Sequence, residues 1–249
     1  MHSIFTKEDI ANINHNPTAG AKIQLVDKLL VAFNTTDLSQ KERLLAEDIL
    51  RLLAADISIS LRESISKKFA SSENLPKDVA LKLATDLEDI VAVPIIEKSP
   101  LLEDEDLLNI LEKTNIIRQS AVARRSNLSS DICSYITNKS PAVVVETLVK
   151  NPSANLAKAQ VDKILANNLN NEKLLRCLIQ FKRIDTEVAH DLLTKVSEDL
   201  RKVLIVEYNI PSSVVNNLIF NSKEWVVLSM IRAHNDGSLD DSLTDQVIN

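Results

Sequence analysis

A short phrase recurs seven times along this chain of 249 residues at nearly constant spacing. Each copy opens with Leu or Ile, continues with mostly polar residues, and closes with an aliphatic residue; two looser copies carry one extra residue. The copies begin at residues 75, 102, 128, 156, 184, 210 and 239, so the intervals are 27, 26, 28, 28, 26 and 29 residues. A fixed period in this range predicts an array of stacked supersecondary units.

The phrase has the composition of a helix start. Ser129 and Asp185 are favourable N-cap residues, and Pro76 and Pro211 suit the first helical position. Several copies place an acid in the first turn, as at Asp131, where the helix dipole favours negative charge. Each copy is therefore predicted to open a helix.

A second apolar segment precedes most copies of the phrase. In residues 90–96, 116–122 and 143–149, aliphatic residues recur at separations of three and four, which indicates helices rather than strands. The only glycines are Gly20 and Gly237, so the chain has no glycine-rich phosphate loop and few sites for tight β-hairpin turns. We predict an all-α fold: a right-handed superhelical solenoid of antiparallel helical hairpins, with a period of about 27 residues.

The first part of the chain departs from the period. Ser39 and Glu42 form a capping-box pattern that opens a helix over about residues 40–55, and an earlier helix is expected over about residues 22–33. Solenoids need atypical end units that cover the last apolar face. We predict an N-terminal tail and helical cap in residues 1–55, followed by a continuous repeat domain in residues 56–249.

Two features of the chain resemble known helical repeats. Pro94 lies inside the aliphatic helical segment 89–98, which resembles HEAT and armadillo repeats, although their usual period is longer, at ~40 residues. Segments 75–86, 93–107 and 121–125 resemble a bacterial HEAT-like family catalogued only as a domain of unknown function, over roughly residues 40 to 220. The resemblance implies an armadillo-type fold and carries no catalytic residues.

The charge and composition argue against several classes of protein. A net charge of -6 and a pI of about 5.3 argue against phosphate neutralisation as the main task, and 3% aromatic residues leave few platforms for base stacking. No apolar run reaches the roughly 18 residues of a membrane span, and the N-terminus lacks a secretory signal. We expect a cytoplasmic protein without membrane insertion, in which Cys133 and Cys177 are buried thiols.

Enzyme chemistry has little support in the sequence. None of the four histidines lies in a metal-binding or zinc-hydrolase motif, and we predict no metal site and no cofactor. His190 lies one helical turn from Glu187, which leaves open a phosphorelay or catalytic role. A surface histidine beside a helix acid explains the pattern equally well, so the chain is predicted not to be an enzyme.

Basic residues recur near the ends of the helices that precede each phrase. Stacked repeats would align these helix ends along one edge, where cations could bind an acidic partner. The alternative is that the cations only complement the helix dipoles. The predicted partner-binding residues at the centre of this edge are Arg118, Arg124, Arg125, Lys150 and Asn151.

The architecture predicts a noncatalytic scaffold or adaptor that binds a protein or peptide along a groove of the solenoid. The groove would be formed by the phrase-initiated helices, with Lys82, Asp86, Asn216 and Asn217 selecting the ligand. Two alternatives stay open at this point: a HEAT-like nucleic-acid-binding protein, and a phosphorelay or enzyme role centred on His190.

Overall fold

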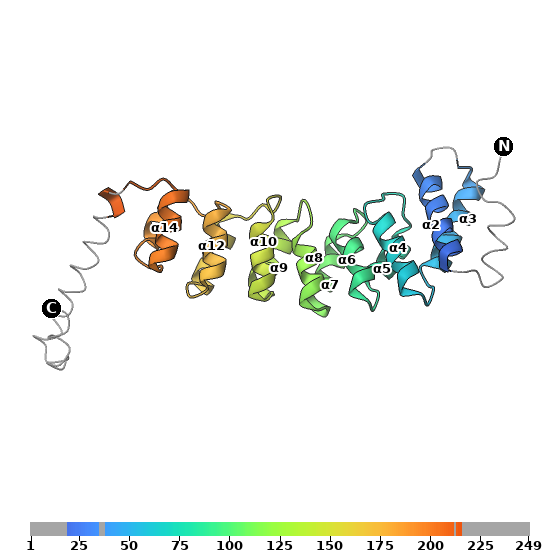
Figure 1. Ribbon diagram of the computed structural model, residues 1–249, viewed down its shortest axis with the longest axis horizontal. Helices are drawn as coiled ribbons and strands as arrows, with labels where there is room; N and C mark the ends of the chain where they lie inside the picture. The colour runs from blue at the N-terminus through green and yellow to red at the C-terminus, as the bar shows by residue number, and fades with distance from the viewer. Residues whose placement is uncertain (1–18, 35–37, 212, 216–249) are drawn as a thin grey trace, which may run out of the picture. The chain divides into compact units, whose positions relative to one another are not determined.

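The computed structural model describes residues 19–34, 38–211 and 213–215. These residues form thirteen α-helices and contain no β-strand, which confirms the predicted all-α class (Figure 1). The helices are α2 (Ala19–Asn34), α3 (Gln40–Leu53), α4 (Ile59–Phe69), α5 (Lys77–Ala84), α6 (Asp89–Lys98), α7 (Asp104–Lys113), α8 (Ile116–Ala123), α9 (Ser130–Lys139), α10 (Ala142–Lys150), α11 (Lys158–Asn167), α12 (Glu172–Gln180), α13 (Thr186–Leu192) and α14 (Glu198–Glu207). In the part of the chain that the structure describes, no helix is both long and apolar enough to cross a membrane.

The chain divides into two compact units, which are described separately below. Unit 1 comprises residues 1–160 and unit 2 comprises residues 161–249, so the division falls within α11. The boundary predicted after residue 55 lies inside unit 1 and stays a prediction.

The recurring phrase marks helix starts, as its chemistry indicates. Helices α5, α7, α9, α11 and α13 each begin two residues after a copy of the phrase begins. The Ser129 hydroxyl accepts a hydrogen bond from the Ile132 N–H at 3.2 Å, and the Asp185 carboxylate accepts one from the Val188 N–H at 2.8 Å. Pro76 occupies the N-cap position, one residue ahead of the predicted place. The last copy, from residue 239, lies outside the described residues.

The predicted capping box at the start of α3 is present. The Ser39 hydroxyl accepts from the Glu42 N–H, and the Glu42 carboxylate accepts from the Ser39 N–H at 3.0 Å. These bonds satisfy two donors that a helix N-terminus would otherwise leave unpaired. Together with α2, this helix confirms the two helices predicted ahead of the repeats.

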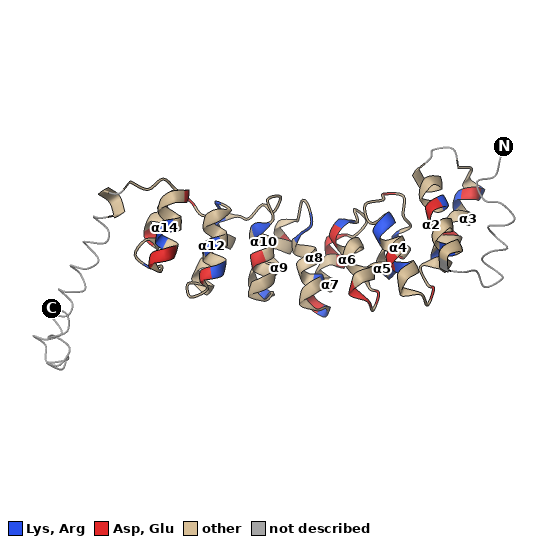
Figure 2. Ribbon diagram, in the orientation of Figure 1, with Lys and Arg blue, Asp and Glu red and all other residues tan. Residues whose placement is uncertain are grey.

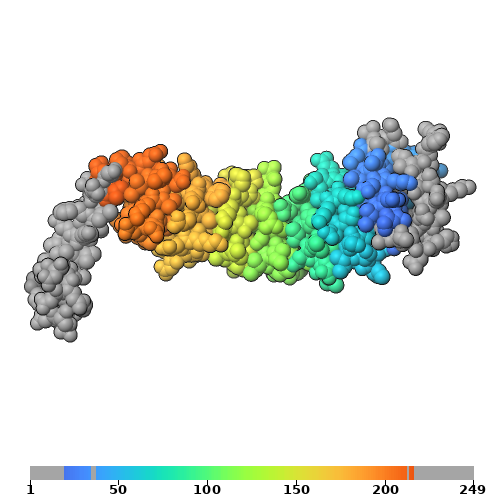
Figure 3. Space-filling model, viewed as in Figure 1, coloured from blue at the N-terminus to red at the C-terminus, as the bar shows by residue number. Residues whose placement is uncertain are grey.

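In unit 1 the even-numbered helices form a continuous row. Helix α4 packs against α6, α6 against α8, and α8 against α10, while α5, α7 and α9 pack on α6, α8 and α10 respectively. Side chains fill the space between these helices (Figure 3). Because α6 is covered on several sides, Val91, Ala92, Ile95 and Ile96 are all fully buried. This explains why residues 90–96 of α6 are a nearly unbroken apolar run.

Three residues other than glycine have a left-handed backbone: Lys182 and Asn209 at the ends of α12 and α14, and Asn127 in the turn between α8 and α9. Asn127, Lys182 and Asn209 have positive φ angles of 54°, 50° and 49°, in the left-handed region that favours glycine. At the end of α12, the Lys182 N–H donates to the Ile179 carbonyl and the Arg183 N–H to the Leu178 carbonyl. This pair of bonds is a Schellman motif, which closes the helix without glycine at the cost of a left-handed lysine.

We predict opposite effects of glycine at two lysines of unit 2. Lys182→Gly should stabilise the protein by up to about 1 kcal/mol, because glycine has no Cβ to strain the left-handed conformation. Lys202→Gly, inside α14, should destabilise it by about 1 kcal/mol because glycine disfavours a helix interior. Urea unfolding of both variants measures the difference, and a destabilising Lys182→Gly would contradict this account of the turn.

Candidate functional site

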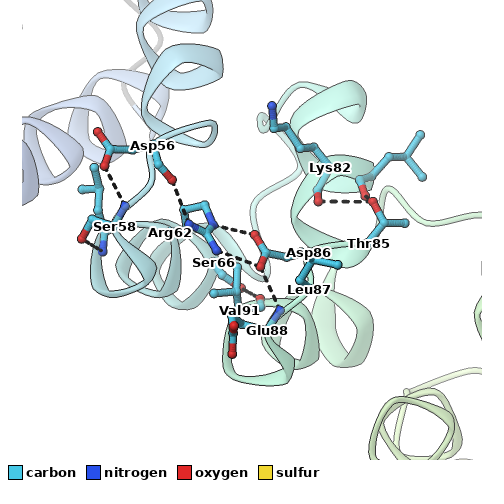
Figure 4. A network of polar contacts seen from close by, with 12 residues as sticks. Asp56, Ser58, Arg62, Ser66, Lys82, Thr85, Asp86, Leu87, Glu88 and Val91 are labelled. Atoms are coloured by element: carbon cyan, nitrogen blue, oxygen red, sulfur yellow. Dashed lines mark hydrogen bonds and ion pairs between the residues drawn. The ribbon is translucent and has the colours of Figure 1, made fainter. Parts of the chain in front are cut away.

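The N-terminal end of α6 is held from the side of α4 by one arginine. The Arg62 guanidinium donates to both carboxylate oxygens of Asp86, at 2.6 and 3.1 Å, and to the Asp56 carbonyl at 2.8 Å (Figure 4). Both side chains of the ion pair are largely buried. Burial alone would raise the pKa of Asp86, but the hydrogen bonds from Arg62 and the Glu88 N–H outweigh it, and the pKa is lowered.

A second arginine holds the same end of α6 from the side of α8. Arg118 Nε donates to Asp89 at 2.6 Å, and Arg118 Nη2 donates to the Leu87 carbonyl at 3.0 Å. The Asn115 amide also donates to both oxygens of Asp89. The hydrogen bonds from Arg118 and Asn115 lower the pKa of Asp89, against the effect of burial. Helix α6 is thus fixed at its N-terminus by residues from both neighbours in the row.

The lowered pKa of Asp89 predicts acid sensitivity with a defined sign. A carboxylate whose folded pKa lies below its ordinary value of 3.8 stabilises the protein above that value, and this stabilisation is lost as the pH falls through the lowered pKa. Asp89→Asn should therefore unfold more easily at neutral pH and lose less stability below about pH 4.

The measurement is urea unfolding of wild type and variant across this pH range. Asp131→Asn, at an exposed acid of α9 without an ion pair among the described residues, is the control. An acid profile of Asp89→Asn that parallels the wild type would contradict the assigned role.

A pocket of about 360 Å³ lies where α6, α8 and α10 end, and we call this surface the C-terminal edge. It contains three of the five predicted partner-binding residues. The residues that line it are Glu97, Arg124, Thr147, Lys150, Asn151 and Pro152. Residues at or after the ends of α6, α8 and α10 therefore line one pocket, and a shared basic edge along the repeats stays a prediction.

Two of the predicted residues use their donors within the chain. Arg125 donates to the carbonyls of Ile96 and Ser99, at 2.5 and 2.7 Å, at the end of α6. Asn151 is buried and donates to the carbonyls of Ala123 and Arg125, at 2.9 and 2.7 Å, at the end of α8. Carbonyls at helix C-termini lack partners within the helix, so each side chain caps the preceding helix of the row. Burial lowers the pKa of Arg125.

The remaining cations of the edge are paired with acids. Arg124 Nε lies 3.1 Å from a carboxylate oxygen of Glu97, and Lys150 Nζ lies 2.5 Å from one of Glu146. The last turns of α4, α6 and α10 carry Lys67 and Lys68, Lys98 and Lys150, and acidic segments are interspersed with them along unit 1 (Figure 2). Arg118 lies at the other end of α8 and does not belong to this edge. Binding by Arg124 and Lys150 stays a prediction.

The two neighbouring arginines should differ in their effect on stability. Arg125→Ala removes charge-assisted hydrogen bonds to two carbonyls and should cost about 2–4 kcal/mol. Arg124→Ala breaks an exposed ion pair and should cost less than about 1 kcal/mol. Thermal or urea unfolding separates the two, and equal effects would show that Arg125 does not tie α8 to α6.

Another opening in unit 1 is a groove between α5 and α7, which we call the α5/α7 groove. It has a volume of about 390 Å³. Its residues are Leu81, Ala84 and Thr85 of α5 and its C-cap, Asp106, Asn109, Ile110, Lys113 and Thr114 of α7 and its C-cap, and Arg118 of α8. The groove has an apolar floor and polar residues of both charges at its rim.

The separation of α5 from α7 leaves the groove open. Helix α7 packs against α9, whereas α5 and α7 are not closely packed along their length. Their N-terminal ends are joined by an ion pair between Lys77 Nζ and a Glu103 carboxylate oxygen, 2.8 Å apart. Between these ends and Arg118, the groove separates the facing sides of the two helices.

The groove lies between two of the phrase-initiated helices, α5 and α7, but the side chains that line it are not the predicted ones. Lys82 and Asp86 do not line the groove: Lys82 is exposed beside it, and Asp86 is paired with Arg62. Helical spacing could have indicated two of the lining residues, Leu81 and Ile110. Leu81 is four residues from Thr85 and Ile110 is four residues from Asp106, so each pair lies on one helix face. Asn216 and Asn217 lie outside the described residues.

His190 of unit 2 is half-buried on α13. Neither it nor Glu187 makes a side-chain hydrogen bond or ion pair within the described part of the chain. Across residues 19–34, 38–211 and 213–215, no three histidines, cysteines or acids gather in a group that could hold a metal ion. The phosphorelay or enzyme role therefore gains no supporting contact.

The fold and the groove define an all-helical protein with rows of packed helices and a polar-rimmed groove. A family described as "Uncharacterised protein conserved in bacteria (DUF2336)" matches residues 91–241, which is more than half of the chain. The chain belongs to this family. No curated protein and no solved structure matches it.

Proposed function

We propose that this protein is a noncatalytic cytoplasmic scaffold that binds a protein or peptide partner in the α5/α7 groove. In this proposal the helix pairs α5/α6, α7/α8 and α9/α10 are HEAT-like hairpins of a right-handed superhelical α-solenoid with a period of about 27 residues. The starts of α5, α7, α9, α11 and α13 at intervals of 26 to 28 residues support the repeat.

The observation that carries the proposal is the α5/α7 groove itself. A volume of about 390 Å³ lies within the range of about 300–1,000 Å³ that ligand sites occupy. Leu81, Ala84 and Ile110 offer apolar contact, while Asp106 and Lys113 offer charges of opposite sign at the rim. A mixed rim around an apolar floor suits a polypeptide, which brings apolar and charged side chains together.

The nucleic-acid alternative has weaker support. Backbone phosphates require a run of unpaired cations, whereas Arg118 and Arg124 are ion-paired with Asp89 and Glu97. The formal net charge of -6 opposes phosphate binding as well. A peptide partner therefore fits the described surface better than DNA or RNA does.

Filling the groove tests the proposal directly. Asn109 is exposed on the groove side of α7, so Asn109→Trp should occupy the space with an indole ring and leave the core intact. Glu112→Trp places the same ring at an exposed position of the same helix outside the groove. Wild type and both variants are used in parallel to purify partners from native cells, with quantification by mass spectrometry.

We expect a set of proteins that wild type and Glu112→Trp retain and that Asn109→Trp reduces about tenfold, equivalent to about 1.4 kcal/mol of binding free energy. Equal capture by all three proteins would contradict binding in the groove. Capture of nucleic acid in place of protein would favour the alternative.

A further inference from the structure

One donor in the α5/α7 groove has no partner. Arg118 is 8% exposed and lines the groove, and its Nε and Nη2 are used by Asp89 and the Leu87 carbonyl. Its third nitrogen, Nη1, forms no hydrogen bond or ion pair within the described residues. Nη1 is not one of the buried side-chain atoms that lack a partner, so it keeps access to solvent and can donate to an acceptor that enters the groove.

The guanidinium is also held in place before any ligand arrives. Its bonds to Asp89 and to the Leu87 carbonyl fix the plane of the group, and Asp89 is itself held by the Asn115 amide. A fixed donor loses little conformational entropy when it binds an acceptor. Because Asp89 balances the charge of Arg118, the net positive charge at this end of the groove comes from Lys113, whose Nζ contacts the neutral Asn109 oxygen at 3.1 Å.

The opposite charge lies further along the same helix. Asp106 lines the groove seven residues before Lys113, which places the two about 10 Å apart along the axis of α7. One oxygen of Asp106 accepts from the Glu103 N–H, and the carboxylate still faces the groove rim. Leu81, Ala84 and Ile110 form the apolar floor of the same groove.

We propose that the α5/α7 groove binds an extended peptide segment in which an aliphatic residue is flanked by a basic residue on one side and an acidic residue on the other. The aliphatic side chain packs on Leu81 and Ile110, the basic side chain faces Asp106, and the carboxylate accepts from Lys113 and Arg118 Nη1. This inference rests on the proposed function and specifies the chemistry of its partner.

Geometry favours an extended segment over a helix. A helix with its side chains is about 10–12 Å wide, which is large for a groove of about 390 Å³. In an extended polyproline II segment, which has three residues per turn and a rise of about 3.1 Å, residues three apart lie on the same face about 9 Å apart, close to the axial separation of Asp106 and Lys113. The expected motif is therefore a basic residue and an acidic residue three positions apart, with an aliphatic residue between them.

The probe is a display library of random peptides selected on the full-length protein, followed by synthetic peptides of any enriched sequence. Affinities are then measured for wild type, Lys113→Glu and Lys98→Glu. Lys98 is the matched control, because it is also exposed in the last turn of a ten-residue helix but lies outside the groove. Both substitutions therefore change net charge and helix-dipole interactions equally.

We expect enriched peptides to carry the basic, aliphatic and acidic pattern. Lys113→Glu should weaken their binding about tenfold, and Lys98→Glu should leave it unchanged. A peptide whose acid is replaced by lysine should bind Lys113→Glu better than it binds wild type. Such a reciprocal exchange would not follow from a general loss of stability.

Two results would overturn the inference, and they differ in what they say of the proposed function. Peptides that bind wild type, fail to bind Asn109→Trp and ignore Lys113→Glu would refute the charge pattern while retaining the groove as a peptide site. Absence of enriched peptides, or peptides that bind Asn109→Trp as well as wild type, would refute both. Displacement of the peptides by inorganic phosphate alone would also contradict a peptide-specific site.

Discussion

The even-numbered helices of unit 1 depend on side chains that hydrogen-bond across to the preceding helix of the row. Arg125 donates to carbonyls at the end of α6, and Asn151 does the same at the end of α8. At the opposite ends, Arg62 and Arg118 hold the start of α6 from its two sides. Since buried carbonyls and carboxylates without partners are costly, these bonds fix both the spacing and the register of the row.

The groove follows from this arrangement. Helix α6 is tied to its neighbours at both ends, whereas α5 and α7 are joined at their N-terminal ends by Lys77 and Glu103. The row of even-numbered helices therefore acts as a fixed base from which α5 and α7 project with space between them. Arg118 belongs both to the row and to the groove, because it holds the start of α6 with two nitrogens and also lines the groove.

The sequence predicted the helices well because their signals are local. The N-cap residues Ser129 and Asp185 bond to amides only three residues away, so each signal is contained in one short segment. The pairing of Arg125 with α6 could not be predicted in the same way. Arg124 and Arg125 are adjacent and chemically identical, yet one reaches carbonyls 26 to 29 residues away and the other forms an exposed ion pair.

The groove also depends on more than one segment. Its volume is set by the distance between α5 and α7, which no single stretch of sequence encodes, and its lining residues alternate with exposed neighbours such as Lys82. A helix turns by about 100° per residue, so a one-residue error moves a side chain from the groove to the solvent. Sequence periodicity located the starts of α5 and α7, and the structure was needed to show which of their faces line the groove.

Hydrogen exchange of the full-length protein, with and without a selected peptide, tests the central claim most directly. The account predicts that the peptide slows exchange in residues 81–85 and 106–114, on the two sides of the groove, and leaves residues 147–152 at the C-terminal edge unchanged. Slower exchange confined to residues 147–152 and Arg124 would contradict it and would place the binding site at the edge that the sequence first indicated.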